Sequence, residues 1–250
     1  YINVQGDKER GDLLFWSEWE ANTLVTELPH TNDSGCAKWL HIPQSPISTQ
    51  IVGACGLQNT DPCVFGTSFK YALCLQEWSS KLRNLERGSL IIFGGRRNFR
   101  FCLDTVFVVG ERTLYDGPDA AQKVSCSEDY RILTLNQTQG ELSFYRGVTW
   151  NQRHDFDGIY SFVPGICLKD RAQIKTLPLE SRKRCALDLN RLRQVVGNSE
   201  SRIFTEGQTQ GYSAIEASQS LIKQIWNELF QQATKFDFVP CVLFPWPRVN

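Results

Sequence analysis

The sequence predicts an α+β fold in which a strongly bent or barrel-like, mostly antiparallel sheet is joined by one prominent C-terminal helix. Short apolar runs rich in β-branched and aromatic residues alternate with glycine- and proline-containing turns, a pattern typical of strands. Only residues 214–235 show a sustained helical period. No linker or low-complexity tract divides the chain, so we expect a single domain over residues 1–250 with long loop insertions at about residues 30–62 and 165–212.

Apolar runs bounded by turn residues predict the strands. Residues 12–16 follow a polar turn, and residues 89–95 and 99–109 are joined by a turn-rich spacer that predicts a hairpin. The other predicted strands are residues 22–28, 142–145, 158–163 and 236–244. Pro240 has no N–H to donate to a ladder, so the last of these strands is expected at a sheet edge or a bulge.

The predicted helix over residues 214–235 has an apolar stripe that we expect to dock against the sheet without a ligand role. Its start is predicted from Ser213 and Glu216, which match a capping box. The residues expected to form the docking stripe are Leu221, Ile225, Trp226 and Leu229.

The composition is that of an ordinary globular protein. Apolar residues make up 41% of the 250 residues and charged residues 22%, and no apolar run approaches the length of a spanning helix. We therefore expect no membrane partner. The 27 basic and 27 acidic residues give a formal net charge of zero, which argues against a protein that holds long nucleic acid through its overall field.

The nine cysteines and three histidines show no pattern of a metal or redox site. No C-x-x-C pair occurs, and no two histidines have helical ligand spacing. Free cysteine packs as a small hydrophobic residue, and a chain of this size needs no disulfide. We interpret the cysteines as mostly reduced core residues of a cytoplasmic protein, and we expect no metal and no cofactor.

Signatures of several enzyme classes are missing from the sequence. The pair Gly94-Gly95 lacks the remaining residues of a phosphate-binding loop, and neither G-x-S-x-G nor H-E-x-x-H occurs. Nucleotide-hydrolysing and zinc-protease classes therefore lose support. A cysteine nucleophile with His30, His41 or His154 as its base stays open, because spacing alone does not test it.

An aromatic and acidic cluster follows the first predicted strand. Trp16, Glu18 and Glu20 would share one face of an extended chain, with Trp19 on the other. A stacking ring beside a hydrogen-bond acceptor suits the recognition of a flat base or a cation. The alternative is that both tryptophans lie in the core and both glutamates are solvated.

A second group of polar and aromatic residues contains Gln58, Asn59, Asp61 and Phe65. Its amides and carboxylate suit a pocket rim that reads the edge of a base or a sugar. The alternative is a rigid turn, because Asn and Asp before Pro commonly bond to the backbone.

Two basic groups complete the candidate residues. Arg96, Arg97 and Arg100 surround the predicted hairpin tip, where they could contact a few phosphates. The second group comprises Arg182, Lys183, Arg184, Arg191 and Arg193. The alternative is that both groups are solvated surfaces.

Short segments of the chain resemble an uncharacterised family of bacterial proteins. They are KERGDLLFWSEWE at residues 8–20, NTDPCVFG at 59–66, FCLDTVFVV at 101–109 and YSFVPG at 160–165. This family brings no established activity. More distantly, Gly-Asp before an apolar strand and a later strand of the DTVFVV kind are similar to the PUA-like barrels of ASCH and EVE domains. That resemblance implies binding of RNA or inspection of modified bases.

The leading hypothesis is a recognition module for a nucleotide, or for a short nucleic-acid element that carries a modified base. Two aromatic rings that stack on a base, together with polar contacts, would support binding of about micromolar affinity. Stacking is expected from Trp16, Trp19 and Phe65, and edge contacts from Glu18, Gln58, Asn59 and Asp61.

Two rival functions come from other classes. A metal-dependent hydrolase or nuclease would use carboxylates as acid/base groups or magnesium ligands, with Arg96 or Arg97 stabilising charge. Its carboxylates would be Glu18, Glu20, Asp61 and Asp104. The other rival is a structural or interaction protein.

Overall fold

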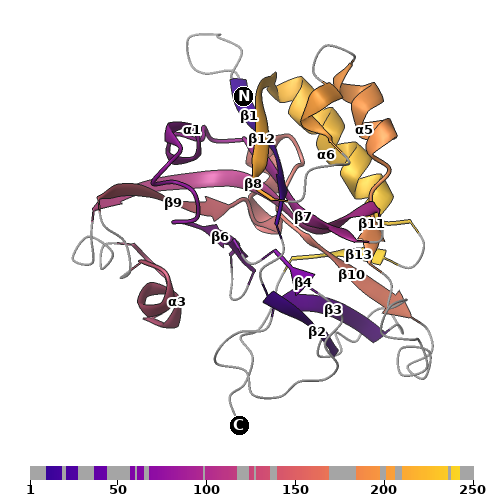
Figure 1. Ribbon diagram of the computed structural model, residues 1–250, viewed down its shortest axis with the longest axis horizontal. Helices are drawn as coiled ribbons and strands as arrows, with labels where there is room; N and C mark the ends of the chain where they lie inside the picture. Colours follow the sequence, from indigo (N-terminus) through magenta and orange to yellow (C-terminus); the bar gives the residue numbers. More distant parts are fainter. Residues whose placement is uncertain are drawn as a thin grey trace.

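The computed structural model describes residues 10–18, 21–27, 37–43, 57–59, 61–64, 68–97, 99–116, 124–126, 128–135, 140–168, 184–197, 201–205, 210–235 and 238–242. It has mixed helix and strand content, with a large, mostly antiparallel sheet and a C-terminal helix (Figure 1). Within these ranges no helix is long and apolar enough to cross a membrane.

The large sheet has eight strands. Seven follow the order β12-β1-β7-β8-β9-β6-β5, and β11 pairs with β8. β1 and β7 are parallel, and the other pairs are antiparallel. The bounds are β1 Arg10–Ser17, β5 Pro62–Cys63, β6 Lys70–Tyr71, β7 Leu90–Arg97, β8 Arg100–Asp116, β9 Glu141–Gly147, β11 Cys185–Ala186 and β12 Tyr212–Ser218. The order ends in different strands, so the sheet is not closed into the expected barrel.

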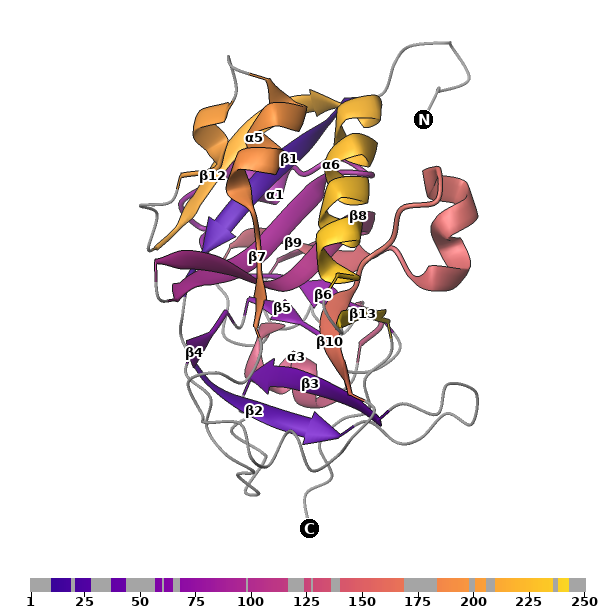
Figure 2. The ribbon, with the colours of Figure 1, turned by 90° about the vertical axis from the view of Figure 1, so that its right-hand side faces the viewer.

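A five-stranded sheet in the order β13-β10-β3-β2-β4 lies below the large one in Figure 2. Its strands are β2 Ala21–Glu27, β3 Ala37–Pro43, β4 Leu57–Gln58, β10 Val163–Leu168 and β13 Phe238–Cys241. Pro240 lies in the edge strand β13, as predicted. Strand β3 falls within residues 30–62, where the sequence predicted a long loop.

The described part of the chain also contains six helices of different lengths. They are α1 Ser80–Arg83, α3 Glu128–Leu133, η2 Trp150–Phe156, α5 Leu189–Val196, η4 Ser201–Ile203 and α6 Gln219–Ala233. Helix α5 and the strand β11 lie within residues 165–212, the second predicted loop insertion. The predicted strand at 158–163 is largely irregular, since only Val163 belongs to β10.

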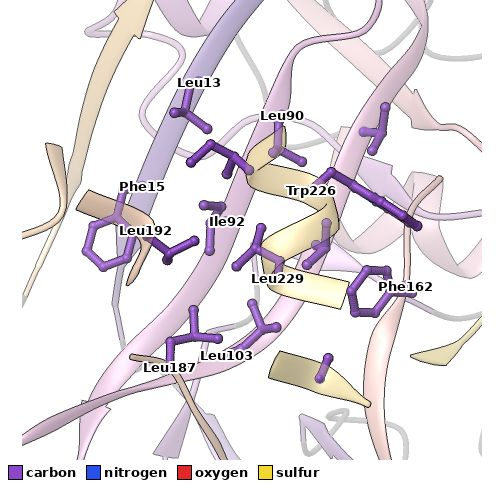
Figure 3. Packing of buried hydrophobic residues seen from close by; sticks show 14 of the residues in the cluster. Leu13, Phe15, Leu90, Ile92, Leu103, Phe162, Leu187, Leu192, Trp226 and Leu229 are labelled. Atoms are coloured by element: carbon purple, nitrogen blue, oxygen red, sulfur yellow. The ribbon is translucent and has the colours of Figure 1, made fainter. Parts of the chain in front are cut away.

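One face of the large sheet is covered by α5 and α6. Alternate residues of β1 and β7, including Leu13, Phe15 and Ile92, pack against helix residues such as Leu192 and Leu229 (Figure 3). The predicted docking stripe is confirmed for Ile225, Trp226 and Leu229, which are buried, while Leu221 is partly buried at its border. The Trp226 indole Nε1–H also donates to the Tyr160 carbonyl at 2.8 Å.

The predicted start of the C-terminal helix is wrong. Residues 212–218 form β12, which pairs with β1 from Arg10↔Ser218 to Trp16↔Tyr212. Helix α6 therefore begins at Gln219, and the Ser218 side chain caps it by accepting from the Leu221 N–H at 3.2 Å. The local capping-box pattern is overridden because β1 needs a ladder partner on the edge that β7 does not occupy.

The other face of the sheet is rich in aromatic side chains. Trp16 is fully buried and contacts the rings of Tyr71, Phe93 and Tyr212, at centroid distances of 5.6, 5.2 and 5.7 Å. Tyr145 stacks on Tyr71 with ring planes 8° apart. These aromatic side chains form a packed layer next to the end of β1.

A bulge interrupts β8 on this face. Phe93 pairs with Thr105 and Gly94 with Leu103, so Asp104 is the extra residue. Only glycine fits at position 94, because a Cβ there would lie 2.2 Å from the Cys102 carbonyl oxygen. Bulges of this kind redirect side chains, and this one directs the Asp104 carboxylate to the buried partners described below.

Candidate functional site

Four polar residues from three segments of the chain meet where β1 ends. They are Glu18, Asn59, Asp61 and Cys74, which we call the polar cluster. The backbone N–H of Glu18 donates to the Gly94 carbonyl at 3.1 Å, which ties the cluster to the middle of β7. The glutamate, the aspartate and the cysteine are half-buried, and Asn59 is only 1% exposed.

The Glu18 carboxylate is held by two donors. The Trp16 indole Nε1–H donates to Oε2 and the Gln210 amide Nε2–H donates to Oε1, both at 3.2 Å. A carboxylate offers about four acceptor positions, so each oxygen of Glu18 keeps capacity for another donor or for a cation. The Trp16 side chain thus orients the carboxylate from below.

Asn59 fixes the position of Asp61 through an Asx turn. Its side-chain Oδ1 accepts from the Asp61 backbone N–H at 2.9 Å, and its own backbone N–H donates to Asp104 Oδ2 at 3.0 Å. The Asn59 Nδ2 atom is buried and has no hydrogen-bond partner among the described residues. An unmade hydrogen bond of a buried amide costs about 1–3 kcal/mol, so this donor stands out.

Cys74 enters the polar cluster from a turn between β6 and α1, where Leu73 and Leu75 have positive φ values of 72° and 57°. Ligand atoms of Glu18, Asp61 and Cys74 all lie within 4.8 Å of one another. Below them the Tyr71 hydroxyl donates to the Cys74 carbonyl at 2.9 Å. Burial, followed by the nearby Asp61 and Cys74, raises the Tyr71 pKa well above its usual value, so the phenol stays protonated.

A buried ion pair anchors the polar cluster to β8. Arg184 Nη1 lies 2.9 Å from Asp104 Oδ1, and the two side chains are 7% and 2% exposed. Burial raises the pKa of the Asp104 carboxyl to about 6, while the Arg184 guanidinium and the Asn59 N–H oppose the shift. Because burial outweighs the pairing, the carboxylate is ionised at neutral pH but gains a proton in mildly acidic solution.

The structure therefore brings together Glu18, Asn59 and Asp61, three residues that the sequence analysis placed in two separate groups. Asp104 joins them through Asn59, although it points to Arg184 and not to solvent. The stacking role expected for Trp16 conflicts with its complete burial; its ring belongs to the core, as the alternative interpretation held.

The remaining predicted residues are not part of the described polar cluster. Trp19, Glu20 and Phe65 fall outside the described residues, as does the side chain of Gln58, whose backbone lies in β4. Arg96, Arg97 and Arg100 lie at the β7–β8 hairpin, as predicted.

Sequence reasoning missed Cys74 and Gln210. Neither belongs to a recognisable motif, and Gln210 lies 192 residues from its partner Glu18. Arg184 appeared only as one member of a basic group, because nothing in the sequence relates it to Asp104. The six described cysteines with known side-chain surroundings, including Cys74, form no disulfide.

The comparisons with known proteins do not extend this picture. No protein-family model matches the chain, and searches of curated proteins and of solved structures also find no match. We therefore infer the function from the chemistry of the polar cluster.

A cleft lies at the opposite end of β1. Its volume is about 520 Å³, and Arg10, Asp12, Lys81 and Glu216 contribute to its walls. The Lys81 Nζ atom already pairs with Asp12 Oδ1 at 2.6 Å, and Arg10 pairs with Glu216 at 3.9 Å. We place the candidate site at the polar cluster because its buried Asn59 donor is unused, whereas these charges neutralise one another.

Proposed function

We propose that this protein binds a nucleotide or a modified base through hydrogen bonds between the polar cluster and the base edge. The observation that carries the proposal is the buried Asn59 Nδ2 donor, which has no partner in the described structure. The Asn59 side-chain oxygen positions Asp61, whose carboxylate lies near that of Glu18. A ligand that supplies one acceptor and one or more donors would satisfy all three groups.

Base edges carry this combination of groups. Adenine, cytosine and guanine each have an exocyclic amino group that can donate to a carboxylate, and a ring nitrogen or carbonyl oxygen that can accept from an amide. Uracil and thymine lack the amino group. Because the cluster offers more acceptors than donors, we expect amino-bearing bases to bind better than thymine.

Stacking in this proposal comes from Trp19 and Phe65, which neighbour the cluster in sequence. Trp16 contributes from beneath by orienting Glu18. The same proposal includes the resemblance to PUA-like domains, which supports base inspection. The open sheet adds no support for that resemblance, because PUA-like domains are barrels.

The test is a calorimetric titration of the protein with the nucleosides adenosine, cytidine, guanosine and thymidine. Asn59→Asp keeps the oxygen that accepts from Asp61 but replaces the unused donor with an acceptor, and Glu18→Gln removes one charged acceptor. Since hydrogen bonds to charged groups contribute about 1.5–3 kcal/mol, each variant should weaken binding about tenfold to a hundredfold.

Matched controls are the exposed residues Asn190→Asp and Glu141→Gln, which should bind like wild type. Circular dichroism of all four variants checks that they are folded. The proposal would be wrong if no nucleoside bound, or if folded Asn59→Asp and Glu18→Gln variants bound as well as their controls.

A second candidate function is a metal-dependent hydrolase or nuclease, which the proximity of Glu18, Asp61 and Cys74 favours. Zn²⁺ accepts sulfur and carboxylate ligands and keeps an open position for water or substrate at catalytic sites. When bound, the ion would activate a water molecule; the chain would hold it through these three side chains. This arrangement departs from the expectation of no metal.

Titration with zinc and manganese chlorides separates the two candidates. Metal binding that is lost in Cys74→Ser but kept in Cys63→Ser, a second half-buried cysteine, would favour the enzyme. Nucleoside binding without added metal, unchanged in Cys74→Ser, would favour the recognition module. A chain that binds neither ligand class would favour the third function considered, a structural or interaction protein.

A further inference from the structure

We propose that the tip of the β7–β8 hairpin is a contact site for single-stranded nucleic acid. The tip consists of Arg96, Arg97, Phe99 and Arg100. Phe99 would stack on an unpaired base and the arginines would contact the adjoining phosphates, which makes the preferred substrate a strand of several nucleotides and not a free nucleotide. One part of the inference rests on the proposed function, namely that another base of the same strand is held in the polar cluster.

Phe99 is an unusual residue to find at this position. Its side chain is 84% exposed, and its φ of 62° is in the left-handed region, which non-glycine residues seldom adopt. Glycine or asparagine would fit such a turn without placing an apolar ring in water. The ring makes no contribution to a core cluster of the described residues, so packing does not explain it.

The surroundings of the ring are positively charged. The Arg96 guanidinium lies 5.4 Å from the Phe99 ring centroid. Arg97 and Arg100 are opposite each other in the backbone register of the hairpin. No acidic residue occurs between Gly94 and Phe101. In a protein of zero formal net charge, three arginines within five residues form a local positive site that can hold a few phosphates without a general affinity for nucleic acid.

The polar cluster is hydrogen-bonded to the middle of β7, the first strand of the hairpin. The Gly94 carbonyl accepts from the Glu18 N–H, and β7 continues for three more residues to Arg97. At about 3.3 Å per residue the tip lies about 10 Å beyond Gly94. Figure 2 shows the hairpin reaching past the arrowhead of β1. A strand with one base in the cluster could therefore place a nucleotide a few positions away on Phe99.

Single strands fit these features better than duplexes. Aromatic stacking needs the face of an unpaired base, whereas the bases of a duplex already stack on one another. An exposed ring among arginines also suits insertion into an anionic membrane surface, so vesicles are included in the test.

The experiment measures fluorescence anisotropy of labelled deoxycytidine oligomers of about six nucleotides, in salt between about 50 and 200 mM. Phe99→Ala should weaken binding about fivefold to a hundredfold with an unchanged salt dependence, because stacking is uncharged. Replacing Arg96, Arg97 and Arg100 with Gln should weaken binding and flatten the slope of log affinity against log salt by about 2.

Matched controls are Trp78→Ala, which removes another exposed ring, and Arg202→Gln, which removes another exposed charge. Both should bind the oligomer like wild type. Equal affinity of the Phe99→Ala variant and wild type would overturn the inference. So would binding to vesicles that contain phosphatidylserine without any binding to the oligomer.

Failure of this inference is distinguishable from failure of the proposed function. Nucleoside binding should be unchanged by Phe99→Ala and weakened by Glu18→Gln if both proposals hold. Oligomer binding that depends on the tip but not on Glu18 would support the hairpin site and contradict the base-reading role of the cluster. The reverse pattern would support the cluster and contradict the hairpin site.

Discussion

The Asp104 carboxylate accepts a hydrogen bond from the backbone N–H of Asn59 at 3.0 Å, although the two residues are 45 positions apart in the chain. This bond connects the bulge of β8 to the turn that carries Asp61. The polar cluster is therefore supported by a buried charge, and its geometry depends on the protonation state of that charge.

Stability should fall as the pH rises from about 4 to about 6, through the titration of Asp104. The folded-state pKa is raised from 3.8 to about 6, so the folded protein binds this proton more tightly than the unfolded chain. At about 1.4 kcal/mol per pKa unit, the contribution lost over the whole titration, from well below pH 4 to well above pH 6, is about 3 kcal/mol, and about 2 kcal/mol of it is lost between pH 4 and pH 6. Urea unfolding of wild type and Asp104→Asn at both pH values isolates the contribution of this residue. A variant with the same pH dependence as wild type would contradict the assignment.

Trp16→Ala should cost about 3–5 kcal/mol of unfolding free energy, as large-to-small changes of buried tryptophan do. The reason is its complete burial among Tyr71, Phe93 and Tyr212. Trp78→Ala is the control, because the Trp78 side chain is 85% exposed and its removal should change stability by less than about 0.5 kcal/mol. Similar urea midpoints for the two variants would show that Trp16 is not a core residue.

Ser218→Ala should destabilise the protein by about 0.5–2 kcal/mol, because the hydroxyl caps the first turn of α6. Ser213→Ala should not remove a helix cap and should have the smaller effect, since Ser213 lies within β12 and not at the start of α6. Thermal unfolding of both variants distinguishes the observed helix start from the one that the capping-box pattern predicts. A larger effect at Ser213 would favour the predicted start.

The thiols of Cys102 and Cys185 should resist alkylation in the folded protein. Burial raises the pKa of Cys102 to about 11 and that of Cys185 to about 12, and only the thiolate reacts. The half-buried Cys74 should be modified by iodoacetamide sooner, as measured by mass spectrometry of peptides over time. Equal rates at these three positions would indicate that the β8–β11 pairing opens readily.

The strands were predictable because their apolar runs are short and bounded by turns. The segment at residues 12–16, for example, lies within β1, and the predicted hairpin of β7 and β8 is confirmed. Local pattern failed where a distant partner decides the structure: Ser213 and Glu216 match a capping box, yet their backbone completes a ladder with β1.

The candidate site was predictable in composition but not in arrangement. Glu18, Asn59 and Asp61 stand out in sequence because polar groups and rings gather around them. The turn of Asn59 and Asp61 lies between β4 of the five-stranded sheet and β5 of the large sheet, so its position is set by strand pairings distant in sequence. The inclusion of Cys74 depends on a turn with two left-handed leucines. No local pattern reports either feature. The bulge at Asp104 likewise arises from a pairing mismatch that only the assembled sheet reveals.

The pairing of β1 with β12 has a consequence for biosynthesis. Arg10 pairs with Ser218, so about 200 residues must be translated before this edge of β1 finds its partner. At about 5–20 residues per second, the ribosome needs about 10–40 seconds to supply them. During that interval the apolar strand has an open edge that invites association with other chains. We expect the nascent protein to depend on chaperones until β12 emerges, and slower translation to increase its aggregation.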